Sequence, residues 1–314
     1  MSDRYLVTGA TGFVGACLVR ELISQKKSVA ILVRNKKLNW RIADIAKKIK
    51  VYEVDLLDKK LENILQEIKP TYIFHLAAYG AVPGKSDINE LITTNLQGTI
   101  KLIEAAKKTP FKLFINTGSS SEYGVKTKKM KETDLAVPIN DYGITKLSAT
   151  LFAQKEAIRN NLPIITFRLF TPYGPYDFKD RFIPYILLHT LQKKSMELSH
   201  AKNVRDFIFI NDVISAYLLA TTKIFNPGEI FNIGSGKQHQ VQEVIDTLFR
   251  LTGTKVPLSW NKVKRDVQIE PKKWEASISK AKTTFGWQPE YNLRDGLAET
   301  IKWYTQNIKL YEKS

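Results

Sequence analysis

The segment Gly9-Ala10-Thr11-Gly12-Phe13-Val14-Gly15 lies between a short apolar run at residues 4–8 and a helical pattern that begins at residue 13. Glycine permits the tight turn from a strand into a helix, and it lets backbone N–H groups approach a pyrophosphate at the positive end of that helix. The strand-loop-helix context therefore predicts a dinucleotide site. The spacing is G-x-x-G-x-x-G, which departs from the common G-x-G-x-x-G. The expected cofactor-binding residues are Gly9, Thr11, Gly12, Phe13, Val14 and Gly15.

Outward from this loop, short β-rich runs alternate with longer helical runs. Such alternation is typical of a parallel sheet covered by helices, so we expect an α/β fold with a doubly wound parallel, Rossmann-type sheet. Strands are expected at residues 4–8, 28–34, 50–54, 72–75, 111–116 and 164–168. Helices are expected at residues 13–25, 61–68, 89–108 and 142–160, with a further helical segment at 40–48.

The regular alternation weakens after residue 168, where Thr171-Pro172-Tyr173-Gly174-Pro175 gathers proline and glycine. Helices are expected beyond it at 182–193, 211–222, 241–252 and 293–304, with strands near 206–210 and 229–233. This pattern indicates a smaller C-terminal α/β substrate lobe. We expect a cofactor-binding domain at residues 1–168 and a substrate lobe at 169–314, some segments of which return to the first domain.

Composition excludes several classes of protein. Of the 314 residues, 43% are hydrophobic and 25% charged, which is ordinary globular usage and excludes disorder of the bulk of the chain. The single cysteine, Cys17, excludes an internal disulfide and a cysteine metal cluster, and it fits a reducing cytoplasm. The start of the chain does not resemble a signal peptide, and no apolar run approaches the length of a membrane span. We expect a soluble, cytoplasmic protein that binds no membrane.

The formal net charge of +17 raises the possibility of a nucleic-acid partner. The lysine clusters are not interleaved with aromatic residues, as a single-strand binder would require. A solvated basic surface is therefore the preferred interpretation, and we expect no nucleic-acid partner.

Residues at the other expected strand ends indicate which cofactor binds. An NAD-selective site usually ends its second strand with an acidic residue, but Val33 stands there and Arg34 follows. A guanidinium can pair with a 2′-phosphate, so NADP(H) is favoured over NAD(H), although Arg34 could also be a simple exposed charge at a strand end. Further cofactor contacts are expected from Asp55 and Leu56 after the third strand and from Leu76, Ala77 and Ala78 after the fourth.

A hydroxyl-rich strand end and one helix supply candidate catalytic groups. Ser119 follows the fifth strand at the carboxyl edge of the sheet, where ligands of such folds bind. Tyr142 and Lys146 are four residues apart, so they share one helical face. A neighbouring ammonium favours a phenolate, so Lys146 is expected to lower the pKa of Tyr142 toward the range of a general acid/base. No metal site is expected.

Together these features resemble the extended short-chain dehydrogenases/reductases of the NAD-dependent epimerase/dehydratase family, which act on nucleotide sugars. The resemblance covers nearly the whole length. Besides the glycine loop and Tyr142-x-x-x-Lys146, the motifs that carry it are His75-Leu76-Ala77-Ala78, Asn95-Leu96-Gln97-Gly98-Thr99, Arg168-Leu169-Phe170-Thr171-Pro172-Tyr173-Gly174-Pro175, Arg205-Asp206-Phe207, Asn232-Ile233-Gly234-Ser235-Gly236 and Phe285-Gly286-Trp287-Gln288-Pro289.

The resemblance implies roles for individual residues. Tyr142 would be the acid/base at the C4 oxygen of the sugar, Lys146 would hold the nicotinamide ribose, and Ser119 would hydrogen-bond the same sugar oxygen. Asn95 and Phe170 match cofactor-lining positions, and the two helices at 89–108 and 142–160 would form a homodimer interface. The substrate-binding residues that it implies are Ser119, Ser120, Glu122, Thr171, Arg205 and Arg265, of which Arg205 would grip the diphosphate.

Departures from the family pattern bear on the reaction. Ser120 and Ser121 stand where 4,6-dehydratases carry an acid and a base, and two neutral serines cannot eliminate water. Thr171 stands where many relatives carry an asparagine. With Arg34, these features favour reduction of the C4 keto group of a nucleotide-linked 4-keto-6-deoxyhexose by NADPH. Two alternatives remain: a 4-epimerase resembling UDP-glucose 4-epimerase with tightly bound NAD, and a non-enzymatic regulator that senses NADP(H).

Overall fold

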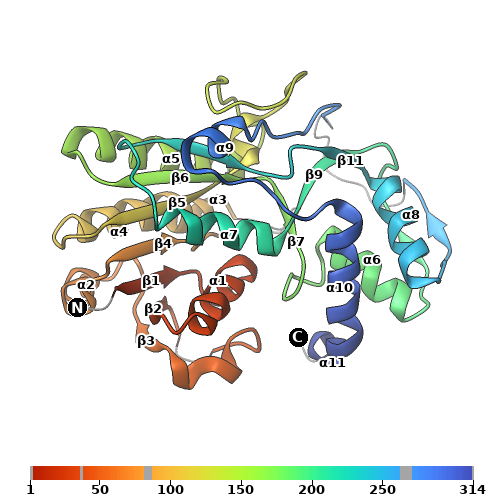
Figure 1. Cartoon of the computed structure of the whole chain (residues 1–314), viewed down its shortest axis with the longest axis horizontal. Coiled ribbons are helices and arrows are strands. Elements are labelled where there is room, and N and C mark those ends of the chain that lie inside the picture. Colours follow the sequence, from red (N-terminus) through yellow and green to blue (C-terminus); the bar gives the residue numbers. More distant parts are fainter. Residues whose placement is uncertain (1–2, 36–37, 81–86, 262–270, 313–314) are drawn as a thin grey trace.

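A seven-stranded parallel sheet forms the centre of the computed structural model, which describes residues 3–35, 38–80, 87–261 and 271–312. The strand order is β10-β6-β5-β4-β1-β2-β3 (Figure 1). From β1 the chain adds strands outward in one direction to β3 and then in the other direction from β4 to β10. This change of direction beside β1 is the doubly wound arrangement, so the predicted fold class is confirmed. The strands are β1 (Arg4–Thr8), β2 (Ser28–Val33), β3 (Lys50–Glu53), β4 (Tyr72–His75), β5 (Leu113–Ser119), β6 (Ile164–Leu169) and β10 (Ile230–Ile233).

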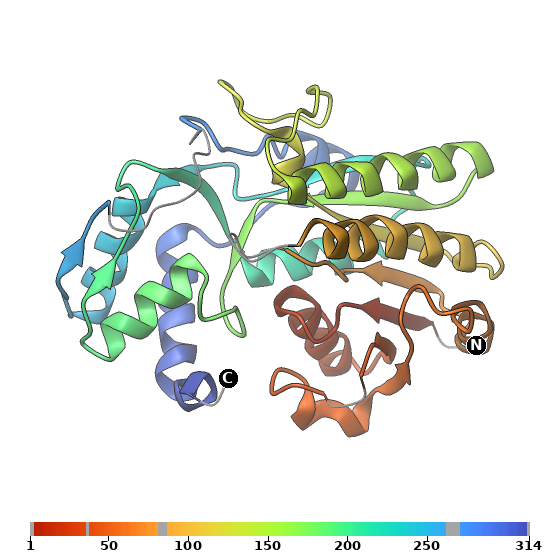
Figure 2. The same cartoon turned by 180° about the vertical axis from the view of Figure 1, so that it is seen from behind.

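Helices cover both faces of this sheet because successive strand residues point to opposite sides. Val7 packs with the helices α1 (Phe13–Ser24) and α7 (Ile210–Ala220), which lie in front of the sheet in Figure 1. Leu6 packs with the helices of the opposite face, which Figure 2 shows from behind. Those helices are α2 (Leu61–Ile68), α4 (Gly98–Ala106) and α5 (Asp141–Asn160).

The predicted helix at residues 89–108 is three consecutive pieces. They are α3 (Ile88–Leu91), a π-helical turn η2 (Ile92–Gln97) and α4. The wider turn carries Asn95, whose side chain bonds the backbone of Tyr79 in both directions: its Oδ1 accepts from the N–H at 2.8 Å and its Nδ2 donates to the carbonyl at 3.1 Å. Periodicity cannot reveal such a turn, and π-turns often lie at functional sites. The segment expected at 40–48 is the 3-10 helix η1 (Ala43–Lys48).

The C-terminal part of the chain builds a smaller lobe and also completes the main sheet. Its strands β7 (Thr171–Tyr173), β9 (Val204–Phe209) and β11 (Gln238–Gln240) form a second sheet, while β8 (Met196–Glu197) pairs with β12 (Leu258–Ser259). The helices α6 (Phe182–Leu191), α8 (Val241–Thr252), α10 (Leu293–Asn307) and α11 (Lys309–Glu312) surround these strands at one end of the molecule (Figure 1). In contrast, β10 pairs with β6, and α9 (Ser279–Phe285) packs Phe285 against Phe231 of β10.

Two further findings concern the described residues only. Their helices include none that is both long enough and apolar enough to cross a membrane. Nor do they bring three or more His, Cys, Asp or Glu side chains together in a geometry that could hold a metal ion.

Candidate active site

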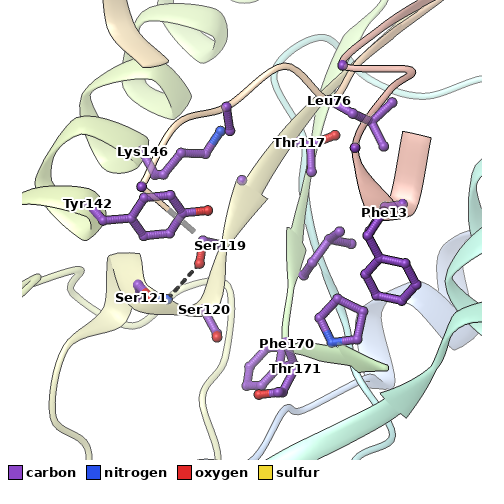
Figure 3. Close-up of a pocket in the computed structure, with 18 of the residues that line it drawn as sticks. Phe13, Leu76, Thr117, Ser119, Ser120, Ser121, Tyr142, Lys146, Phe170 and Thr171 are labelled. Carbon is purple, nitrogen blue, oxygen red and sulfur yellow. Dashed lines mark hydrogen bonds between the residues drawn. The ribbon is translucent and has the colours of Figure 1, made fainter. Parts of the chain in front are cut away.

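One cavity opens where the carboxyl ends of the central strands face the C-terminal lobe, and Figure 3 shows most of its side chains. Segments far apart in the sequence line it, from the glycine loop to the stretch before α9. The lining residues are Gly9, Gly12, Phe13, Val14, Gly15, Leu76, Ala78, Tyr79, Gly80, Thr117, Gly118, Ser119, Ser120, Ser121, Tyr142, Lys146, Leu169, Phe170, Thr171, Pro172, Phe178, Arg181, Arg205 and Trp274.

The glycine loop packs so closely against the surrounding backbone that side chains at two of its glycine positions would collide with it; we call this loop the glycine cradle. Gly9 has φ +68°, and a Cβ there would lie 2.5 Å from the backbone nitrogen of Ala77. A Cβ on Gly15 would lie 2.2 Å from the carbonyl oxygen of Gly9. Gly12 is the N-cap of α1 and has no side chain to occupy the first amide groups of the helix. The loop therefore fits the pyrophosphate of a nicotinamide dinucleotide, bound at the positive end of α1.

Tyr142 and Lys146 enter the cavity from the first turns of α5 (Figure 3). This helix starts at Asn140, whose Oδ1 accepts from the N–H of Gly143 at 2.7 Å. Gly143 is needed at this point because a Cβ would lie 2.5 Å from the carbonyl oxygen of Ser121. The close approach holds the helix against the end of β5, so the ring of Tyr142 lies beside Ser119.

Ser119 is the last residue of β5, which runs three residues beyond the predicted strand end. It also caps the following 3-10 turn η3 (Ser120–Tyr123), because its Oγ accepts from the N–H of Ser121 at 3.1 Å. Its hydroxyl proton is free of the cap and is donated to the Tyr142 oxygen in the cavity. The strand and the cap together fix the position of this hydroxyl.

The electrostatics of Tyr142 and Lys146 differ from the sequence-based expectation. Burial raises the pKa of Tyr142, and it outweighs the hydrogen bond to Ser119 and the charge of Arg181, both of which lower it. The expected lowering of the Tyr142 pKa by Lys146 is therefore wrong. Burial also lowers the pKa of Lys146 to about 8, against the opposing charge of Glu122.

Glu122 does not reach the cavity, although it is one of the expected substrate-binding residues. Its side chain is fully buried, and its Oε1 accepts from the Ser119 N–H at 2.8 Å and from the Thr150 hydroxyl at 3.1 Å. Its Oε2 accepts from Nε of Arg168 at 2.7 Å. A Cβ on Gly118 would lie 2.5 Å from Oε1, so the glycine admits the carboxylate. The structure thus places Glu122 beneath the site as a support for Ser119.

Ser120 lines the cavity and is bonded to a residue that sequence analysis did not single out. The indole Nε1–H of Trp274 donates to Ser120 Oγ at 3.2 Å. The guanidinium carbon of Arg205 lies 5.3 Å from the centre of the Trp274 ring. Trp274, Thr117, Phe178 and Arg181 all line the cavity without having been predicted, because no local motif distinguishes them.

Of the remaining expected residues, those that the structure describes lie outside the cavity lining. Asn95 is buried behind it, where it holds Tyr79, and Ala77 donates its N–H to the Thr8 hydroxyl. Arg34 is exposed directly after β2, and Thr11 lies half-buried in the loop. The other three are Asp55, which is exposed, Leu56, which contacts Gly98, and Arg265, which lies outside the described residues.

Comparisons with known proteins agree with this geometry. Residues 5–234 match the model of the NAD dependent epimerase/dehydratase family. The chain is 30% identical to a UDP-glucuronate 4-epimerase of Thermodesulfobacterium geofontis, with 98% of this chain and 97% of the relative covered. It is 27% identical to a dTDP-glucose 4,6-dehydratase of Haemophilus influenzae, with 96% of this chain and 98% of the relative covered.

A solved structure is similarly close. The UDP-glucuronic acid 4-epimerase of Bacillus cereus, solved in complex with UDP-glucuronic acid and NAD, superposes with a TM-score of 0.87 at 28% identity. The match covers 97% of this chain and 99% of that one. The resemblance seen in the sequence motifs is thereby confirmed.

Proposed function

Because the chain belongs to the NAD-dependent epimerase/dehydratase family, we propose that it inverts C4 of a nucleotide-diphosphate sugar with the help of bound NAD. The observation that carries this proposal is the meeting of Tyr142, Ser119 and Lys146 in one cavity with the glycine cradle. A nucleotide-sensing regulator would not need these three side chains together, so an enzyme is the better interpretation.

The chain's own residues account for the proton steps. Tyr142 takes the proton of the C4 hydroxyl when the alcohol becomes a ketone and returns it when the alcohol re-forms on the opposite face. Ser119, held by its cap, hydrogen-bonds the same oxygen, and Lys146 orients the nicotinamide ribose. NAD, held by the glycine loop and Lys146, would supply the acceptor and donor of the C4 hydride. Arg205 is assigned to the diphosphate. Phe170, which lines the cavity, and Asn95, which holds the lining residue Tyr79, are assigned to the cofactor side.

Water elimination fits these residues less well. Dehydration across C5 and C6 needs an acid and a base beside Tyr142, and the positions after Ser119 are the neutral Ser120 and Ser121. Ser120 is moreover bonded to Trp274, and the nearby carboxylate of Glu122 is committed to Arg168. Epimerisation needs no acid or base at these two positions.

Reduction of a 4-keto sugar by NADPH is the second candidate, and Arg34 favours it. Its exposed side chain follows β2, where the family's cofactor selectivity is set, so it could pair with a 2′-phosphate. The UDP-glucuronic acid 4-epimerase of Bacillus cereus was solved with NAD, which supports epimerisation as the first candidate.

The proposal extends to the organisation of the protein. We assign residues 1–168 mainly to the cofactor and 169–314 mainly to the sugar, with Thr171 and Arg265 as substrate contacts and Asp55, Leu56 and Thr11 as cofactor contacts. The side chains of Ile144, Leu151 and Ile158 lie seven residues apart on α5 and are exposed, which supports a homodimer through the two long helices. The lone Cys17 supports a place in the cytoplasm.

The test is the fate of the nicotinamide. The purified protein is denatured and its released nucleotides are identified by mass spectrometry, and it is then incubated with UDP-hexoses. Retained NAD and interconversion of two C4 epimers without net nicotinamide consumption support the proposal. Stoichiometric oxidation of NADPH by a nucleotide-linked 4-keto-6-deoxyhexose, without epimerisation, would favour the second candidate. Loss of water from the hexose would contradict both.

A further inference from the structure

The cavity carries a marked excess of positive charge. Among the described residues that line it, three are cationic, Lys146, Arg181 and Arg205, and none is acidic. The proposed function uses Lys146 beside the nicotinamide ribose and Arg205 at the diphosphate. Arg181 has no part in it.

Arg181 is the N-cap residue of α6 and is oriented by a buried carboxylate. Its Nη1 lies 3.3 Å from Oδ1 of Asp177, whose side chain is 2% exposed. The guanidinium carbon also lies 5.9 Å from the centre of the Phe13 ring in the glycine loop. The side chain therefore bridges the lobe and the cofactor loop instead of extending into solvent.

The loop before α6 that presents Arg181 is itself fixed at several points. The Tyr311 hydroxyl of α11 donates to the carbonyl of Asp177 at 3.0 Å, and Nε of Arg41 donates to the carbonyl of Tyr176 at 2.7 Å. A guanidinium fixed in this way loses little conformational entropy when it binds a ligand. This is the arrangement of a binding group, since a solvated surface charge needs no such support.

The position of Arg181 relative to the reacting atoms is also informative. Arg181 and Tyr142 line the same cavity, and the charge of Arg181 acts to lower the pKa of Tyr142, so Arg181 faces the space in which the proposed sugar would lie. The hydroxyls of Ser120, Ser121 and Thr171 line the same cavity. A guanidinium with hydroxyl donors around it suits a planar carboxylate, which accepts all of these hydrogen bonds and carries the opposite charge, whereas the hydroxyls of a neutral sugar form only uncharged acceptors for the same guanidinium.

We propose that Arg181, held by Asp177, binds a carboxylate on the sugar, so that the preferred substrate is a nucleotide-diphosphate hexuronic acid and not a neutral hexose. This inference rests on the proposed function for the placing of the sugar beside Tyr142. It assigns Arg181 the role of a specificity-determining residue.

Binding measurements test this assignment directly. Calorimetric titration of the full chain, saturated with NAD, compares UDP-glucuronic acid with UDP-glucose. We expect the acidic sugar to bind at least about tenfold more tightly, the scale of one charge-assisted contact. In Arg181→Gln that affinity should fall about 10- to 100-fold while UDP-glucose binding changes less than about twofold.

Two further variants sharpen the result. Arg181→Lys keeps the charge but loses the planar fork, so it should lie between the wild type and Arg181→Gln. Lys302→Gln removes one exposed cation of α10 outside the cavity lining and should leave both affinities unchanged. Because the Arg181 side chain is 22% exposed, and because both Gln and Lys keep an N–H donor for the buried Asp177, these replacements should not unfold the protein.

The outcomes separate this inference from the proposed function. Equal binding of the two sugars, absence of binding by both, or an equal loss for both in Arg181→Gln would overturn the inference. A loss of NAD retention in Arg181→Gln with unchanged sugar binding would also overturn it, since Arg181 would then serve the cofactor. Arg181-dependent binding of the acidic sugar without C4 inversion would support the inference and contradict only the proposed function.

Discussion

At the scale of single residues, the Tyr142 hydroxyl is the group on which the proposed chemistry depends. Tyr142→Phe keeps the ring but removes the only proton that this residue can carry. We expect kcat to fall about 10²- to 10⁴-fold with cofactor retention nearly unchanged. Steady-state rates and bound-nucleotide analysis measure the two effects. Tyr185→Phe, which removes a hydroxyl that accepts from the Glu197 N–H in the lobe, is the matched control and should retain full turnover. Near-normal turnover of Tyr142→Phe would show that another group transfers the proton.

Glu122 and Arg168 form a buried ion pair beneath Ser119, one of the proposed catalytic residues. Glu122→Ala leaves the Arg168 guanidinium buried without its carboxylate, so the free energy of unfolding should fall by about 3–5 kcal/mol. Urea unfolding measures this loss. Glu104→Ala, which breaks a surface pair with Lys107, should cost at most about 1 kcal/mol. Equal costs for the two variants would mean that the buried pair contributes no more than an exposed one.

At the scale of elements, local patterns predicted most of the fold. The bounds of β1, β4 and α2 match the sequence-based ranges because the two strands are short apolar runs and the helix is an amphipathic repeat, each between polar or turn residues. The π-turn at η2 was missed, since it depends on the bonds between Asn95 and Tyr79, which come from a distant loop. The predicted end of β5 was also too early because of contacts between distant segments. Thr117, Gly118 and Ser119 pair with β6, but small polar residues do not by themselves predict a strand.

The pair of helices α4 and α5 is joined near their ends by Glu156, which makes ion pairs with Lys107 and Lys155. These two lysines hold the pKa of Glu156 at about 2, below its ordinary 4.5. A lowered pKa in the folded state means that the pairs stabilise the protein fully above pH 4.5 and that this contribution is lost as the pH falls toward 2.

Glu156→Gln should therefore lower the melting temperature at pH 7. On acidification, the melting temperature of this variant should fall less than that of the wild type. Melting curves between pH 7 and pH 3 compare the two slopes. The exposed Glu299→Gln of α10 should follow the wild-type curve. If the melting temperatures of Glu156→Gln and the wild type fell equally steeply with pH, the ion pairs of Glu156 would not contribute to the acid sensitivity of the protein.

At the scale of the whole molecule, the site is assembled from both parts of the chain. Tyr142, Lys146 and the glycine loop were found from their spacing because each belongs to one local unit. Trp274 and Arg181 could not be found in this way, since only the packing of the lobe brings them to the cavity. The charge of the cavity is likewise a property of the folded chain, because Glu122, the neighbour in sequence of the lining residue Ser121, has its side chain turned inward.

The outer face of α5 bears on how two molecules would associate. Ile144, Leu151 and Ile158 are 48%, 52% and 63% exposed, and their seven-residue spacing places them in one stripe. A stripe of large aliphatic side chains along a long helix is expected to be covered by a partner, here the same helix of a second copy.

Leu151→Asp tests this association. In a symmetric dimer the change occurs twice, and losing two buried leucines costs about 3–6 kcal/mol, so the dissociation constant should rise by roughly 10²- to 10⁴-fold. Light scattering during size exclusion should then report the mass of one chain, against two for the wild type. Ile224→Asp, at a side chain that is 99% exposed outside α5, should leave the dimer intact. A wild-type protein that runs as a monomer at high concentration would contradict this interface. Dissociation in Ile224→Asp alone would instead indicate an interface near the end of α7, because only the face that is buried between copies is sensitive to a new charge.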